Sequence, residues 1–191
     1  MDTRTALLDS AERAARQRGF DAFSYADLAR DVGIRKASIH SLLPLMALLA
    51  LRLILRYAAR SSERRAEIDR EHQTAAGKLG AFLALYREAL AEGTQLCLCV
   101  ALSAGRDSLS PPVLEQLAEF HEESAAWLEQ VFTAAREDRS VIGLSDPQDE
   151  ADALLALVEG AQLVARAAKD VTLFDRATAA FRAHLAPTQL N

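Results

Sequence analysis

The sequence predicts an all-α fold, and three observations lead to this prediction. Alanine, leucine, glutamate and arginine are abundant, and these residue types favour helices. Glycine and proline, which interrupt helices, occur only eight and five times in 191 residues. Apolar residues also recur at helical spacing in almost every segment between turn signals. Half of the residues are hydrophobic and 26% are charged, so the chain can bury a substantial core as a globular protein.

The first expected element is an amphipathic helix over residues 3–18. Thr3 can cap its start, and Gly19 ends it. Phe20 and Phe23 follow, and we expect both rings to fill a small core of three helices. The apolar side chains on the inner face of this first helix are Leu7, Leu8, Ala11, Ala14 and Ala15.

Residues 24–43 predict two short helices joined by a tight turn. Ser24 can cap the first helix by accepting a bond from a free backbone N–H. Leu28 and Val32 lie four residues apart and form its apolar face. Gly33 can adopt the left-handed conformation that ends a helix. Two short helices around a glycine turn are typical of a helix-turn-helix, whose second helix enters the major groove of DNA.

The second of these helices carries side chains suited to DNA. Arg35 and Lys36 can neutralise phosphates or reach guanine N7 and O6. Ser38 and His40 can hydrogen-bond phosphates or base edges, and Ala37 lets the backbone approach closely. Spacing alone leaves an alternative open, namely an ordinary helical hairpin with a solvated basic end.

Residues 5–40 also resemble the DNA-binding domain of TetR-family transcriptional regulators. The matching residues are Gly19-Phe20, the run Ser24-Tyr25-Ala26-Asp27-Leu28-Ala29, Val32-Gly33, and Arg35-Lys36-Ala37-Ser38-Ile39-His40. The resemblance implies an N-terminal helix-turn-helix domain followed by a helical ligand-binding and dimerisation domain. It also implies that the DNA contacts come from Ser24, Tyr25, Arg35, Lys36, Ala37, Ser38, Ile39 and His40.

The sequence departs from the family pattern just after the second short helix. The family has an aromatic residue, Phe, a small residue and Lys here, and that Lys contacts a phosphate at the start of the fourth helix. The corresponding residues in this chain are Leu42, Leu43, Pro44, Leu45, Met46 and Ala47. Met46 cannot make this contact, so we expect one phosphate contact fewer per subunit. A helical regulator with weakened or lost DNA binding is therefore an alternative function.

We expect the DNA-binding domain to cover residues 1–44 and the second domain to cover residues 45–191. Apolar periodicity and turn residues place the later helices at residues 45–71, 74–92, 94–106, 113–139, 146–170 and 172–185. The expected capping or first-turn residues of these helices are Pro44, Ser110, Asp146 and Thr172. The alternating charges of residues 63–71 are interpreted as a solvated helix face.

The resemblance implies a small-molecule effector bound among the central helices. Candidate pocket residues combine apolar or aromatic surface with a few polar groups, and they are Tyr86, Cys97, Cys99, Leu102, Phe120, Trp127 and Gln162. Core packing is the alternative interpretation for each. The two cysteines can be small core residues, a sensor of an electrophile or oxidant, or ligands of a soft metal, for which the chain offers no further ligands.

No catalytic constellation is recognisable in the sequence. It has no glycine-rich phosphate loop, no metal-ligand spacing and no Ser, His and acidic residues grouped together. We therefore expect no cofactor, no metal and no enzyme activity. A small-molecule-binding protein or an enzyme on the same fold stays open as an alternative.

The last two expected helices predict a homodimer. Residues 147–170 carry more apolar side chains than one inner stripe requires, and residues 172–185 carry a second stripe. With their two-fold copies these helices would form a four-helix bundle. The expected interface residues are Leu154, Leu157, Val158, Ala161, Val164 and Phe181.

Charge is distributed unevenly along the chain. Residues 1–60 hold ten Lys/Arg and six Asp/Glu, whereas residues 61–191 hold twelve and twenty-one. A basic N-terminal part on an acidic body favours nucleic acid binding at one end. Two cysteines, the lack of a signal peptide and the lack of a bilayer-length apolar run predict a cytoplasmic protein without a membrane partner. We expect a transcriptional repressor that binds double-stranded operator DNA as a homodimer and is released by a small molecule.

Overall fold

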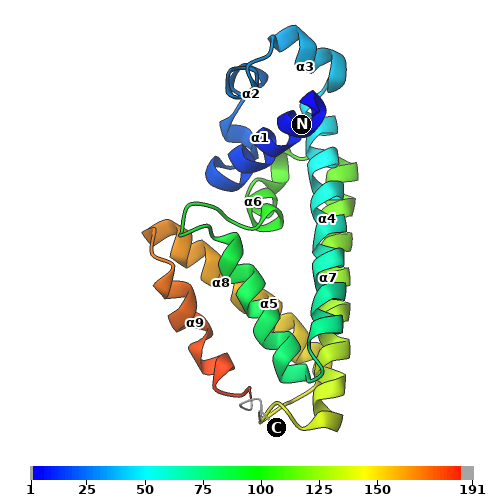
Figure 1. Ribbon diagram of the computed structural model, residues 1–191, viewed down its shortest axis with the longest axis vertical. Helices are drawn as coiled ribbons and strands as arrows, with labels where there is room; N and C mark the ends of the chain where they lie inside the picture. Colours follow the sequence, from blue (N-terminus) through cyan, green and yellow to red (C-terminus); the bar gives the residue numbers. More distant parts are fainter. Residues whose placement is uncertain (1, 186–191) are drawn as a thin grey trace. The chain divides into compact units, whose positions relative to one another are not determined.

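The computed structural model describes residues 2–185, which form a succession of helices (Figure 1). The α-helices are α1 (Thr3–Arg18), α2 (Tyr25–Val32), α3 (Lys36–Leu42), α4 (Met46–Glu71), α5 (Ala75–Ala89), α6 (Leu98–Ala104), α7 (Pro111–Asp138), α8 (Pro147–Ala168) and α9 (Thr172–Arg182). Two short 3₁₀ helices are η1 (Phe20–Ala22) and η2 (Arg106–Ser108). In this described part no β-strand forms, and an isolated antiparallel bridge joins Val141 to Leu185. The all-α prediction is confirmed.

The described chain packs into two compact units, each made of two chain segments. Unit 1 contains residues 2–60 and 95–120, and unit 2 contains residues 61–94 and 121–185. Helices α4 and α7 therefore contribute to both units. The boundary expected between residues 44 and 45 divides a DNA-binding domain from a ligand-binding domain. This functional division stays a prediction.

The core of unit 1 includes the three N-terminal helices. Leu7 of α1, Leu28 of α2 and Ile39 of α3 are at most 1% exposed. The buried rings of Phe20 and Phe23 meet edge to face with centroids 5.5 Å apart, which confirms their place in the three-helix core. The same core continues into α4, α6 and α7 through Leu49, Leu53, Ile54, Leu98, Leu102 and Leu117.

Local signals set the start and the end of α2 as the sequence predicts. Ser24 is its N-cap residue, and the Asp27 carboxylate accepts bonds from the Ser24 backbone N–H (2.9 Å) and hydroxyl (2.8 Å). These bonds hold the pKa of Asp27 below its usual value. Gly33 follows α2 in the left-handed conformation, with φ 74° and ψ 32°, where a residue with a Cβ would be strained.

Helix α6 begins later than the sequence predicts, at Leu98 rather than near residue 94. The backbone N–H of Leu96 donates to the carbonyl of Arg16 (3.0 Å), and the carbonyl of Leu96 accepts a bond from Arg16 Nε (2.7 Å). Because both backbone groups of Leu96 are engaged by α1, they cannot enter a helical hydrogen-bond ladder.

Two expected capping residues are also displaced by one position. Asp2, not Thr3, is the N-cap residue of α1. Val171, not Thr172, is the N-cap residue of α9, and the Asp170 carboxylate accepts bonds from the backbone N–H (2.9 Å) and hydroxyl (2.7 Å) of Thr172. A carboxylate that accepts both donors satisfies the helix start better than the threonine hydroxyl alone, because a charged acceptor forms stronger hydrogen bonds.

Unit 2 is built from α5, α8, α9 and the adjoining parts of α4 and α7. Its almost fully buried side chains include Leu79, Leu83, Phe132, Val158 and Phe174. Asp146 caps α8 as predicted, with its carboxylate accepting a bond from the Gln148 N–H at 3.0 Å, and Pro147 opens the helix. The adjacent helices α8 and α9 lie side by side (Figure 1).

The charged run over residues 63–71 is largely exposed, as its alternating signs predict, but two of its positions are buried. Arg65 is only 7% exposed and donates to Ser124 Oγ (3.2 Å) and the Glu123 carboxylate (3.1 Å). Ile68 is 3% exposed and belongs to the buried set of unit 2. The expectation is wrong for these two positions because α7 packs against this part of α4 and supplies polar partners for the guanidinium.

An ion pair between α5 and α9 should make unit 2 sensitive to acid. Arg87 donates two bonds to the Asp175 carboxylate, at 2.7 and 3.0 Å, and they hold the pKa of Asp175 below its usual value. The stabilisation is therefore complete above the unfolded-state pKa of about 3.9 and is lost as pH falls through the lower folded-state pKa.

We expect Asp175→Asn to lower the free energy of unfolding above about pH 4. Below that pH, the free energy of unfolding of the variant should decrease less steeply with falling pH than that of the wild type. Urea denaturation at a series of pH values measures both effects. Asp152→Asn removes an exposed carboxylate from α8 and serves as the control. Equal acid dependence in the wild type and Asp175→Asn would contradict the prediction.

Candidate functional site

The exposed face of α3 gathers most of the residues expected to contact DNA. Five of the six expected positions on this segment are exposed, namely Arg35, Lys36, Ala37, Ser38 and His40. Within residues 2–185, neither Arg35 nor Lys36 forms an ion pair, so both charges are available to phosphates. Ile39 is fully buried in the core of unit 1, so its side chain orients α3 and does not reach a groove.

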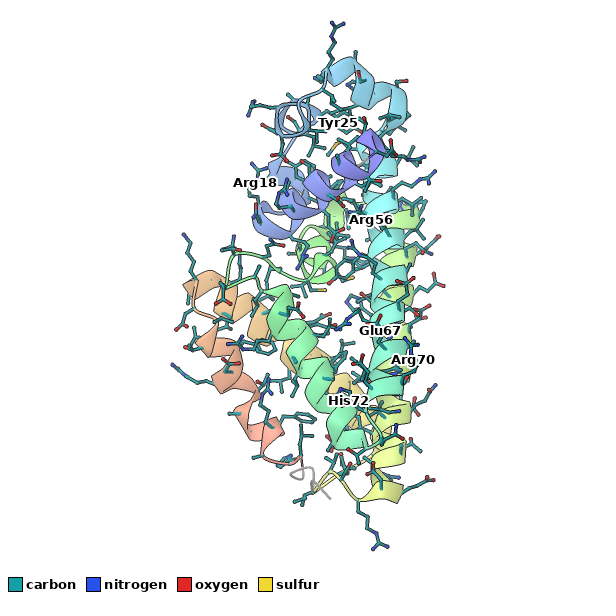
Figure 2. All side chains as sticks on the ribbon, viewed as in Figure 1. Arg18, Tyr25, Arg56, Glu67, Arg70 and His72 are labelled. Carbon is teal, nitrogen blue, oxygen red and sulfur yellow. The ribbon has the colours of Figure 1, made fainter. Side chains whose placement is uncertain are left out.

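Tyr25 links the first turn of α2 to α3. Its ring is 6% exposed and meets the ring of His40 edge to face, with centroids 4.9 Å apart. Figure 2 labels Tyr25 on the ribbon. The Tyr25 hydroxyl is buried and has no hydrogen-bond partner among the described residues. Burial raises the pKa of this hydroxyl. Ser24, the other predicted residue on this side, is exposed.

The unpartnered hydroxyl of Tyr25 leads to a prediction about stability. A buried polar group without a partner costs about 1–3 kcal/mol. We expect Tyr25→Phe to raise the free energy of unfolding by about 1 kcal/mol, because it keeps the ring against His40 and removes the hydroxyl. Chemical denaturation measures the change. Tyr25→Ala, which also removes the ring, should instead destabilise the fold, and a loss of stability in Tyr25→Phe would contradict the prediction.

Asp31 ties α2 to α1. Its carboxylate accepts bonds from the Ser10 hydroxyl (2.5 Å) and the Arg13 guanidinium (2.7 Å). These bonds hold the pKa of Asp31 below its usual value. Because Ser10 is only 3% exposed, this attachment reaches into the packed face of α1 and fixes α2 there.

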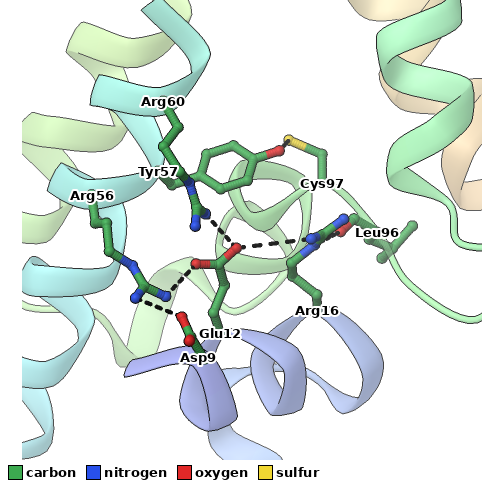
Figure 3. Close-up of polar contacts among 8 residues, drawn as sticks. All are labelled: Asp9, Glu12, Arg16, Arg56, Tyr57, Arg60, Leu96 and Cys97. Carbon is green, nitrogen blue, oxygen red and sulfur yellow. Dashed lines mark hydrogen bonds and ion pairs between the residues drawn. The ribbon is translucent and has the colours of Figure 1, made fainter. Parts of the chain in front are cut away.

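A cluster of charged residues joins α1 to α4 within unit 1, and we call it the Glu12 cluster (Figure 3). Glu12 is 6% exposed, and its carboxylate accepts bonds from Arg56 (2.8 Å) and Arg60 (2.6 Å). Arg16 lies 3.8 Å from the same carboxylate, and Arg56 also pairs with Asp9 at 2.8 Å. Three arginines converging on one buried carboxylate make Glu12 the centre of the contact between the two helices.

Tyr57 extends this contact towards the segment before α6. Its hydroxyl donates to Cys97 Sγ at 3.2 Å (Figure 3). Its ring packs against Phe120 with centroids 5.9 Å apart. The Arg60 guanidinium lies 5.7 Å from the Tyr57 ring centroid, within cation–π range. Burial, followed by the neighbouring Cys97 and Cys99 thiols, raises the pKa of Tyr57 well above its usual value.

Sequence patterns did not indicate the Glu12 cluster or the Tyr57 contact. Glu12 falls between the apolar positions of α1, and its partners lie 44 and 48 residues further along the chain. The only available signal was the spacing of Arg56 and Arg60, which lie four residues apart and therefore share one face of α4.

The residues expected to line an effector pocket divide between the two units. Cys97, Cys99, Leu102 and Phe120 are buried in the core of unit 1. Both cysteines are free thiols. Their burial agrees with the interpretation as small core residues, and it leaves the other interpretations untested.

The remaining pocket candidates lie close together in unit 2. Gln162 is fully buried, and its side-chain amide donates to the Tyr86 carbonyl at 2.6 Å. The Phe82 ring lies between Tyr86 and Trp127, with centroids 4.8 and 5.7 Å away. Trp127 Nε1 donates to the Asp69 carboxylate at 2.9 Å. These side chains form an aromatic row with polar ends, the combination that ligand pockets use.

The residues expected at the dimer interface differ in their exposure. Leu154, Val158 and Ala161 are buried inside unit 2, whereas Leu157 and Phe181 are half-buried and Val164 is 56% exposed. Leu163, the neighbour of Val164, is 47% exposed. An outer face of α8 with two large exposed apolar side chains is unusual for a surface that contacts only water.

Residues 2–185 contain no group of three or more His, Cys, Asp or Glu side chains that could hold a metal ion. In the same residues no single helix has the length and apolar character needed to cross a membrane. The bent pair formed by α3 and α4 meets that criterion, by length and composition alone.

The geometry defines a helix-turn-helix regulator, because an exposed basic α3 follows α2 across a glycine turn and the rest of the chain is helical. The family of tetracyclin repressor-like C-terminal domains matches residues 75–181. The chain therefore belongs to the TetR family of transcriptional regulators. No curated protein matches the chain significantly.

Solved structures support the same assignment. A TetR-family transcriptional regulator from Agrobacterium tumefaciens is similar with a TM-score of 0.91 and 25% identity, covering 97% of this chain and 98% of that one. The reduced form of NemR from E. coli is similar with a TM-score of 0.81 and 25% identity over 99% and 100% of the chains. A TetR regulator from Legionella pneumophila shares the fold, with a TM-score of 0.84, 23% identity and coverage of 97% and 98%. The resemblance found in the sequence is confirmed.

Proposed function

We propose that the protein is a repressor that binds operator DNA as a homodimer and leaves the DNA when a small molecule binds. The observation that carries this proposal is the start of α3, where Arg35 and Lys36 are exposed and unpaired within the described chain. The buried Ile39 holds this helix on the core, so the basic side chains project from a fixed support. The two α3 helices of a dimer would enter successive major grooves about 34–36 Å apart.

The outer face of α8 supports the homodimer. An added Cβ at Gly160 would meet no atom within 4 Å, so packing inside the protomer does not require glycine there. Glycine inside a helix costs about 1 kcal/mol relative to alanine. Close approach of a second helix would explain why glycine stands here, between Leu157 and the exposed Leu163 and Val164.

The effector is proposed to act by shifting a conformational equilibrium. A ligand bound among the central helices releases DNA if it binds more tightly to a dimer whose α3 helices have the wrong separation. The aromatic row of Phe82, Tyr86 and Trp127, with the buried amide of Gln162, supports a ligand that is largely apolar with a few polar groups.

Replacing Lys36 with alanine tests the proposed DNA contact. We expect operator affinity to fall, and the slope of log affinity against log salt to become less steep by about one unit per subunit if Lys36 contacts a phosphate. If Lys36 contacts a base instead, its replacement should cost about 1–3 kcal/mol of binding free energy, and this cost should depend on the DNA sequence. Fluorescence anisotropy with operator DNA selected from genomic fragments measures both quantities.

Arg176→Ala is the matched control, because it removes one exposed positive charge from α9 in unit 2. It should leave the salt slope unchanged. If Lys36→Ala binds the operator with the affinity and salt slope of the wild type, α3 does not contact DNA through this residue.

A further inference from the structure

Unit 1 contains a pocket that is separate from every residue expected to line the effector site. Its volume is about 350 Å³, within the range of small-molecule sites. It is lined by η1 with Phe23, by the first turns of α4, and by the segment from η2 to the start of α7. Since all three segments belong to unit 1, the pocket is part of one compact structure.

The wall of this pocket is apolar and closely packed. The rings of Phe20 and Phe23 stand perpendicular to each other, and both are less than 9% exposed. Leu109 and Ala50 are buried beside them, and Met46 is half-buried. Aromatic edges and small aliphatic groups of this kind favour a flat apolar ring.

The polar groups beside the pocket are mainly hydrogen-bond acceptors. Asp21, Ser108 and Ser110 line it. The Ser108 hydroxyl lies 2.8 Å from the Asp21 carboxylate and 2.8 Å from the Gly105 carbonyl. One hydroxyl has a single proton, so it cannot fully satisfy both acceptors.

The Asp21 carboxylate can therefore accept further hydrogen bonds. Within residues 2–185, no cation pairs with its carboxylate. Gly105 leaves room for it, because a Cβ at that position would lie 3.3 Å from Asp21 Oδ2. A carboxylate next to hydroxyl and carbonyl oxygens is complementary to a group with a positive charge and several N–H donors.

We propose that this pocket binds a small primary ammonium compound that carries an aromatic ring. The three N–H donors of the ammonium face the acceptors of Asp21, Ser108 and Ser110, and the ring packs against Phe20 and Phe23. The site is independent of the proposed effector pocket, since the two share no residue. A compound bound here contacts the start of α4 and the connection between α1 and α2, both of which adjoin the helix-turn-helix.

Met46 provides a direct probe of this site. The chain has two methionines, and the other is Met1, so a protein labelled with [methyl-¹³C]methionine gives only two methyl signals. Met46→Leu identifies the signal from the pocket. The test titrates 2-phenylethylammonium chloride into the full-length protein, with 2-phenylethanol as the neutral isostere and phenylacetate as the anionic one.

We expect 2-phenylethylammonium to shift the Met46 methyl signal saturably in the millimolar range. Asp21→Asn keeps the shape of the side chain and should weaken binding about two- to fivefold, the range expected for one exposed ion pair. Asp107→Asn removes a carboxylate of η2 that does not line the pocket, and it should bind like the wild type. Ala47→Trp, which fills the pocket from an exposed position, should abolish the shift while the helical circular dichroism is retained.

Three results would overturn the proposal. The first is the absence of any saturable shift of the Met46 signal. The second is equal affinity for 2-phenylethanol and 2-phenylethylammonium, which would show that the carboxylate does not recognise the charge. The third is a shift that persists in folded Ala47→Trp, or one that Asp107→Asn weakens as much as Asp21→Asn.

Discussion

Replacing Glu12 with glutamine should lower the free energy of unfolding by about 3 kcal/mol. Removing one partner of a buried ion pair costs about 3–5 kcal/mol, because the remaining charge is left without compensation. We expect a loss at the lower end of this range, because the Arg60 side chain is 46% exposed and Arg56 keeps its contact with Asp9. Urea denaturation followed by far-ultraviolet circular dichroism measures the change.

Asp9→Asn is the matched control for this prediction. Asp9 pairs with the same Arg56 at 2.8 Å, but its side chain is 44% exposed. Exposed pairs contribute at most about 1 kcal/mol, so this variant should lose far less stability than Glu12→Gln. Equal losses in the two variants would show that burial of the Glu12 carboxylate does not determine the strength of the α1–α4 contact.

Replacing Val164 with arginine should convert the proposed dimer into a monomer and remove operator binding. Val164 is 56% exposed in the single chain, so the substitution should leave the protomer folded. In the dimer the same arginine would bury a charge without a partner beside its own two-fold copy. Losing the second subunit removes an avidity of about 10²–10⁴, so we expect operator affinity to fall by at least a hundredfold.

Sedimentation equilibrium should then report the mass of one chain, 20.8 kDa, at micromolar concentration. Ala126→Arg introduces the same side chain at an exposed position of α7, and it should leave both mass and affinity unchanged. A dimeric Val164→Arg protein would place the interface on another surface. A monomeric variant with full operator affinity would separate dimerisation from DNA binding.

Local patterns predicted most of the fold correctly. The ends of α1 and α2, the opening of α8 by Pro147 and the buried Phe20 and Phe23 all depend on residues that lie close together in the sequence. The exposed positions of α3 were predicted in the same way, with support from the family resemblance. Such features follow from capping, glycine conformation and helical spacing, which act within a few residues.

The features that sequence reasoning missed depend on contacts between distant residues. The late start of α6 results from Leu96 binding Arg16, which lies 80 residues earlier. Burial of Arg65 follows from Ser124, which lies 59 residues later. A polar side chain is expected at the surface by default, and no local pattern shows that another helix will supply its partners.

The assembly of unit 1 from two distant segments limits how hybrid regulators can be made by recombination. A crossover after residue 60 would transfer the helix-turn-helix without residues 95–120. The transferred Leu53 and Ile54 would then face side chains selected in another protein, instead of Leu98 and Leu117. A functional chimera should therefore require a double crossover that moves residues 95–120 together with residues 1–60. Under the proposed function, we expect DNA specificity to change more readily by substitutions on the exposed face of α3 than by exchange of segments.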